Sequence, residues 1–317
     1  MACRRHAARE MFGVVLSRAV SPRALRILGL ASLLSGLVVL FPRQAVWAEA
    51  EPGAKSAHCP AEMVRVEQFC IDRYEMATVD HQTGELLSPF YPPKVSLVER
   101  VLLSWNLERR SFGRLRARSV PLPELPRVQQ TRRDYTPRAV SRPGIVPQGY
   151  LSQTLARLAC ENAGKRLCTE DEWITACRGE QRRKFPYGDE YEEGRCNVYV
   201  RLHPAFALHG SASYGHRDPR LNLVENSEGR ALLRPTGATP QCASRWNGDR
   251  IYDLVGNIDE WVDAEKAQFL GGFYARGTRE GCEAHVRSHV AAYYDYSTGG
   301  RCCRTLKEGN GAAGKLR

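Results

Sequence analysis

CENAGKRLCTEDEWITACRG, the sequence of residues 160–179, contains the end of one predicted helix and the whole of the next. Ser152 is a favourable N-cap for the first helix, whose apolar residues recur on one face until Gly164 stops it. Thr169 and Glu172 form a capping box at the start of the second helix, and the last glycine of the quoted stretch ends it. We therefore predict two short helices in direct succession.

The rest of the chain favours short strands joined by turns. An apolar-rich piece at 63–74 is predicted to be a strand or hairpin edge, which a bridge between Cys59 and Cys70 would clasp. Further short apolar pieces at 251–255 and 269–274 lie among many Gly, Pro, Asn and Tyr residues. The sequence therefore predicts an α+β fold with two helices on irregular, turn-rich β structure.

The first fifty residues have the layout of a secretory signal. A basic start precedes an apolar run at 27–41, and small residues flank a plausible cleavage point near Ala48. A membrane span needs ~20 residues, so this run is short for one, and an uncleaved anchor is the alternative. We predict a signal peptide at 1–50, no membrane span after cleavage, a periplasmic or secreted location, one domain at 51–308 and a flexible tail at 309–317.

The cysteines support this location. Of eleven, only Cys3 falls in the predicted signal, and the remaining ten are an even number. An even set behind an export signal is typical of a disulfide framework, and we find no paired CxxC spacing for zinc.

The basic charge is concentrated in one segment. Residues 94–148 contain twelve basic and four acidic residues, a net charge of +8 within a total of +11. Eight prolines lie between Pro92 and Pro147, so we predict a partly disordered insertion outside the packed core. An exported protein rarely meets nucleic acid, so we expect an anionic envelope polymer, a lipid headgroup or an exported protein as partner. A solvated insertion with no partner is the alternative.

Four stretches, taken together, resemble the formylglycine-generating enzyme family, also called the sulfatase-modifying factor family. They are FCIDRYE at 69–75, the stretch at 160–179, DLVGNIDEW at 253–261, and GG at 271–272 with GRCC at 300–303. Their order and spacing also match. The resemblance implies a C-type-lectin-like fold with little regular secondary structure, stabilised by disulfides and bound calcium.

The resemblance also implies where structural calcium would bind. The carboxylates of Asp253 and Glu260 and the carbonyls of Gly256 and Ile258 match one set of ligands, and calcium prefers such oxygens. A second site would begin at a position resembling Asn197 and Val198, and its other ligands are not placed. The alternative to the first site is a turn in which Glu260 pairs with an arginine.

Two disulfide pairings come from the resemblance, Cys160 with Cys302 and Cys177 with Cys282. Four cysteines then have no determined partner. Of their pairings we favour Cys196 with Cys242 and Cys168 with Cys303.

The resemblance fails at the catalytic position. Family members that make formylglycine bind Cu(I) through two cysteines, five apart, soon after the paired glycines. Here Arg276 or a neighbour takes the first position, and Cys282 is the expected partner of Cys177. We therefore predict no catalytic residue and no copper. His285 and His289 have a spacing that could bind a metal, but surface or packing roles are favoured.

Two classes of function remain. The first is a calcium-stabilised binding or scaffolding module of the cell envelope. The second is an oxidative tailoring enzyme, of formylglycine-generating or pyoverdine-maturation type, that acts on an exported substrate. The absent thiol pair favours the first.

Overall fold

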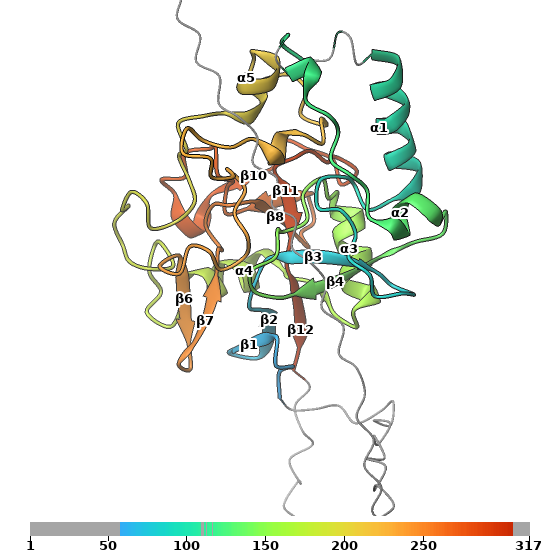
Figure 1. Ribbon diagram of the computed structural model, residues 1–317. Coiled ribbons are helices and arrows are strands. Elements are labelled where there is room, and N and C mark those ends of the chain that lie inside the picture. Colours follow the sequence, from blue (N-terminus) through green and yellow to red (C-terminus); the bar gives the residue numbers. More distant parts are fainter. Residues whose placement is uncertain (1–57, 109–110, 112, 116, 307–317) are drawn as a thin grey trace, which may run out of the picture. The chain divides into compact units, whose positions relative to one another are not determined.

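The computed structural model describes residues 58–306 apart from residues 109, 110, 112 and 116 (Figure 1). The predicted signal peptide and C-terminal tail lie outside the described residues. The helices are α1 (Val95–Glu108), α2 (Arg127–Thr131), α3 (Gln153–Asn162), α4 (Glu170–Arg178) and α5 (Pro204–His209), with 3-10 turns at Ala117–Ser119, Leu221–Leu223 and Gly281–Glu283. None of the helices in this described part is both long and apolar enough to cross a bilayer.

The strands are short and numerous, as predicted for an α+β fold. They are β1 (Met63–Val66), β2 (Phe69–Asp72), β3 (Met76–Asp80), β4 (Pro137–Ser141), β5 (Arg166–Leu167), β6 (Ala243–Trp246), β7 (Asp249–Tyr252), β8 (Asp259–Val262), β9 (Gln268–Leu270), β10 (His285–Val286), β11 (Thr298–Gly300) and β12 (Cys302–Thr305).

Two four-stranded sheets contain the sequence motifs. One has the order β1-β2-β12-β5, so the expected N-terminal hairpin pairs with the terminal GRCC stretch. The other has the order β10-β9-β8-β11, with β8 and β11 parallel. Trp261 of β8 is completely buried, as is Trp173 of α4. The motifs therefore meet in the core although they are distant in sequence.

The two predicted helices are confirmed with their caps. The Ser152 side chain accepts a hydrogen bond from the backbone N–H of Leu155 at the start of α3. Thr169 and Glu172 form the expected capping box of α4. Such caps stabilise helix ends because the first N–H groups have no partner within the helix.

Five disulfides cross-link the strands and helices. The bonds join Cys59 to Cys70, Cys160 to Cys302, Cys168 to Cys303, Cys177 to Cys282, and Cys196 to Cys242. These are the pairs expected or favoured from the sequence. Three of the five join α3, α4 or the residue just before the α4 cap to β12 or to the 3-10 turn at Gly281–Glu283, so they tie the helical pair to the C-terminal part of the chain.

The basic segment at 94–148 differs from its prediction as a partly disordered insertion outside the packed core. It is part of the packed structure: α1 has fourteen residues, and β4 pairs with β3 from Met76 opposite Ser141. Gln148 is completely buried and donates to the carbonyl of Tyr91. The prolines stand in loops or at the ends of elements, where a missing N–H costs little; Pro137, for example, is the first residue of β4.

Candidate functional site

The position at which the resemblance places a copper-binding cysteine holds an ion pair. Arg276, in the loop after β9, donates a hydrogen bond from Nη2 to Oδ1 of Asp259 in β8. Burial raises the pKa of Asp259 to about 7, although the Arg276 charge opposes the shift. The sulfur of Cys282 is bonded to Cys177 and is not available as a ligand. This arrangement supplies a half-buried guanidinium and a buried carboxylate in place of thiols.

A buried arginine contacts the predicted calcium motif. Arg301, beside the GRCC cysteines, donates from Nη2 to Glu260 Oε1 at 2.7 Å and from Nε to Oε2 at 2.9 Å. The indole N–H of Trp173 donates to Oε2 at 2.7 Å. Arg301 also donates to the carbonyls of Asp72 and Tyr252. The Glu260 carboxylate is thus fully engaged.

Two further carboxylates lie near this pair. Burial raises the pKa of Asp253 to about 6, although a hydrogen bond from the N–H of Gly237 opposes the shift. Glu75 is completely buried and accepts a hydrogen bond from Asn257. Burial and the charges of Asp253 and Glu260 raise its pKa well above the ordinary value. Three acids therefore share the positive charge of one buried Arg301.

As arranged here, these residues do not fit a calcium ion. Both oxygens of Glu260 accept hydrogen bonds, and Arg301 already supplies a positive charge at the site. Within the described part of the chain, no three His, Cys, Asp or Glu side chains converge on one point as metal ligands. Calcium at Asp253 and Glu260 stays a prediction from the resemblance.

The two predicted calcium stretches nevertheless lie together. The backbone N–H of Asn257 donates to the carbonyl of Asn197, and the Asn197 amide donates to Oδ1 of Asn257. Gly256 has a φ of +82°, and a Cβ there would fall 2.5 Å from the Asn197 carbonyl oxygen. Glycine is therefore required for this close approach. The Oδ1 atom of Asn197 is buried without a partner among the described residues.

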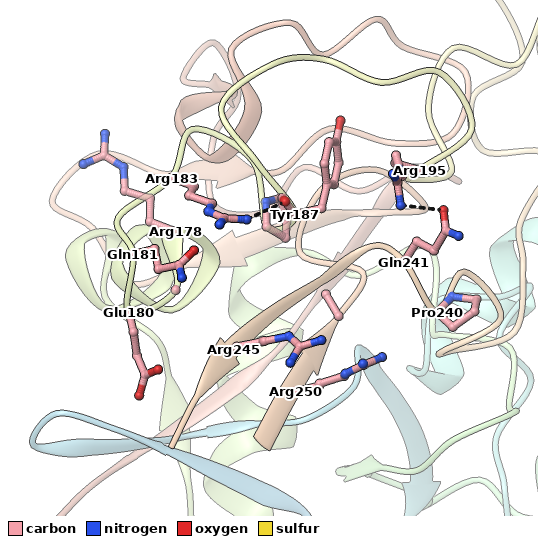
Figure 2. Close-up of a pocket in the computed structure, with 13 residues that line it drawn as sticks. Arg178, Glu180, Gln181, Arg183, Tyr187, Arg195, Pro240, Gln241, Arg245 and Arg250 are labelled. Carbon is pink, nitrogen blue, oxygen red and sulfur yellow. Dashed lines mark hydrogen bonds between the residues drawn. The ribbon is translucent and has the colours of Figure 1, made fainter. Parts of the chain in front are cut away.

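A cleft lined with arginines lies elsewhere on the surface. Its cavity of about 490 Å³ is formed by the end of α4, the loop that follows it, and the β6–β7 hairpin (Figure 2). One acidic residue, Glu180, lines it. The basic residues that line it are Arg178, Arg183, Arg195, Arg245 and Arg250.

Three of these arginines are anchored at the cleft edge. Arg178 pairs with Glu283. Arg183 donates to the carbonyl of Tyr187 at 2.8 Å, and Arg195 donates to the Gln241 side chain at 3.0 Å (Figure 2). These bonds fix the guanidinium groups in place, as recognition of an anion requires.

The other two arginines face each other across the hairpin. Arg245 and Arg250 are directly opposite in the β6–β7 register, and Figure 2 shows them side by side. Neither forms an ion pair with any residue that the structure describes. Like charges directly opposite destabilise a hairpin. This pair was not among the predicted site residues, although the Asn247-Gly248 turn signal predicts the register that places the two arginines opposite each other.

Comparisons with known proteins agree with the four motifs. The model of the sulfatase-modifying factor enzyme 1-like domain matches residues 43–286. The inactive C-alpha-formylglycine-generating enzyme 2 of Mus musculus is 24% identical over 221 residues, which cover 67% of this chain and 63% of that protein. The formylglycine-generating enzyme of Mus musculus is 33% identical over 117 residues, 37% of this chain and 26% of that protein.

Among solved structures, PvdO from Pseudomonas aeruginosa matches with 16% identity and a TM-score of 0.36, covering 78% of this chain and all of that one. The chain spans less than two thirds of the length of the curated relatives it matches.

Proposed function

We propose that this chain, which belongs to the sulfatase-modifying factor enzyme 1-like family, is an exported binding module that holds an anionic ligand in its arginine cleft. Its α+β fold is of the formylglycine-generating enzyme type. Export is supported by five disulfides, which persist in oxidising compartments, and by the signal-like layout of residues 1–50.

The observation that carries the proposal is the pair Arg245 and Arg250. Placing two guanidinium groups opposite each other is unfavourable in the free protein, and a bound anion would remove that repulsion. Arginine also presents a planar fork that matches carboxylate, phosphate and sulfate oxygens. The chemistry of the cleft is therefore that of anion recognition, without a group that attacks or oxidises a ligand.

The alternative is an oxidative tailoring enzyme acting on an exported substrate. It is favoured by the similarity to a protein named formylglycine-generating enzyme. Against it stand Arg276 at the expected cysteine position and the bond between Cys177 and Cys282. Metal analysis of the purified protein separates the two: tightly bound copper or iron would support the enzyme.

The test of the binding proposal is titration of the protein with tripolyphosphate by calorimetry. Arg245→Ala with Arg250→Ala should weaken binding at least tenfold, since charge-assisted hydrogen bonds contribute about 1.5–3 kcal/mol each. Raising the salt concentration should weaken wild-type binding. The matched control changes Arg142 and Arg201 to Ala, because both are exposed and neither lines the cleft. Equal losses in the two double variants would refute the cleft as the site.

A further inference from the structure

A second cavity, of about 470 Å³, lies between α1 and two loops at 213–219 and 293–294. Figure 1 places α1 and the β6–β7 hairpin on opposite sides of the domain, so this cavity is separate from the arginine cleft. Its lining combines aromatic rings with positive charge. The aromatic and basic residues of this lining include Trp105, Tyr214, Tyr294, Arg100 and Arg217.

The loop at 213–219, which forms one wall, is held in place by buried hydrogen bonds. Asp218 is buried and accepts hydrogen bonds from Arg220 and from Nε2 of His209. Its own carbonyl accepts from the hydroxyl of the buried Tyr150. Arg217, the neighbour of Asp218 at the surface, has its guanidinium 4.7 Å from the centre of the Tyr294 ring. The charged wall is therefore preorganised rather than loose.

Arg220 joins this loop to the basic segment. Its Nη1 donates to the carbonyls of Ala117 and Val120, and its guanidinium lies 4.6 Å from the centre of the Trp105 ring. Arg220 is 1% exposed. A fully buried arginine persists only when its charge and donors are satisfied, as they are here. The contacts of Arg220 therefore help to keep the α1 side of the cavity ordered.

We propose that this cavity binds a sugar ring that bears a carboxylate. The ring of Tyr214, which is 60% exposed, offers an aromatic face that packs against the apolar face of a pyranose ring. Arg100 and Arg217 are exposed at the opening and can pair with a carboxylate, and the hydroxyl of Ser104 can bond to sugar hydroxyls. The volume fits one or two rings of an oligosaccharide, and a further ring would extend from the opening. This site is additional to the arginine cleft and does not depend on it.

The probe is trigalacturonate, with neutral maltotriose as its matched control, titrated into the full disulfide-bonded protein. Trigalacturonate should bind and maltotriose should bind at least tenfold more weakly. Arg217→Ala and Tyr214→Ala should each weaken trigalacturonate binding at least tenfold. Both side chains are exposed, whereas Trp105→Ala would also remove a contact of Arg220. Because the Tyr214 ring lies edge-on to His209, whose side chain is buried, an unchanged melting temperature of Tyr214→Ala is the control for local structure.

The arginine cleft provides the second control. Arg245→Ala with Arg250→Ala should leave trigalacturonate affinity unchanged, while Arg217→Ala should leave tripolyphosphate affinity unchanged. Loss of trigalacturonate binding in the cleft variant would overturn the proposal, because acidic sugars would then bind in the cleft. Equal affinity for maltotriose, or no effect of Arg217→Ala and Tyr214→Ala, would overturn it as well.

Discussion

The domain has a cross-linked part and a cysteine-free part. The cross-linked part, residues 58–93, 149–196 and 242–306, contains all five disulfides and the family motifs. The cysteine-free part, residues 94–148 and 197–241, contains α1, α2, α5 and most of the aromatic cavity. Both parts consist mainly of irregular chain with few long helices or strands. They differ in whether covalent bonds or buried polar contacts keep that chain ordered.

Each part has a completely buried arginine paired with a carboxylate, and the comparison shows two uses of the same pair. Arg301 binds Glu260 next to the Cys160–Cys302 bond, where the chain is already constrained. Arg220 binds Asp218 where no covalent constraint exists, and it bridges to a segment 100 residues away in sequence. In the second case Asp218 neutralises the arginine, and the hydrogen bonds of the guanidinium to the Ala117 and Val120 carbonyls maintain the tertiary contact.

The largest effect should come from removing the two adjacent long-range disulfides together. Replacing Cys160, Cys168, Cys302 and Cys303 by Ala opens bonds with sequence separations of 142 and 135. Because the Cys177–Cys282 bond stays closed, the loops released are roughly 30 and 10 residues long, and the free energy of unfolding should fall by about 6 kcal/mol on the chain-entropy model. The control is Cys59 with Cys70, whose separation is 11 and whose expected loss is about 3 kcal/mol. Denaturant unfolding measures both. Equal losses would mean that these two long-range bonds do not set the stability of the cross-linked part.

Next in size is the loss of the Arg301 charge. Arg301→Met leaves Glu260 buried without its partner and should lower the free energy of unfolding by about 3–5 kcal/mol. Glu260→Gln should be milder, since a neutral amide keeps a hydrogen-bonding oxygen. The predicted calcium site implies instead that a bound ion neutralises these acids, and a chelator tests this alternative. If EDTA lowers the melting temperature of the wild type, and Glu260→Gln abolishes that effect, calcium rather than Arg301 neutralises these acids.

Arg220→Met should act locally. It removes the hydrogen bonds to Ala117 and Val120, so the 3-10 turn at Ala117–Ser119 and the chain after it should open while the cross-linked part stays folded. Trypsin should then cut between Arg118 and Arg142 in the variant, whereas the wild type resists there. The melting temperature of the cross-linked part should change less than in Arg301→Met. Wild-type cleavage in this segment at the same rate would show that Arg220 does not order it.

The difference between the two parts also explains what the sequence could predict. The helices, the hairpin and the cysteine partners of the cross-linked part follow from local signals such as the capping box at Thr169 and from matched motifs. The order of the basic segment was missed because its proline and arginine content was averaged over 55 residues, which hid a fourteen-residue helix. The role of Arg220 depends on carbonyls 100 positions away, which no local pattern reports. The arginine cleft was not predicted for the same reason, because its residues come from three separate stretches of the sequence.

The smallest effect should have the opposite sign and concerns the hairpin of the cross-linked part. Arg250→Thr removes the like-charge contact with Arg245 and places a strand-favouring residue in β7, so the free energy of unfolding should rise by about 0.2–1 kcal/mol. Tripolyphosphate binding should fall in the same variant. A residue whose loss stabilises the protein and weakens binding is retained for the ligand, since a covalently constrained scaffold tolerates such repulsion. Arg142→Thr is the matched control, because its exposed side chain lies outside the cleft and should alter neither quantity. A stability loss in Arg250→Thr with unchanged binding would make the cleft arginines structural.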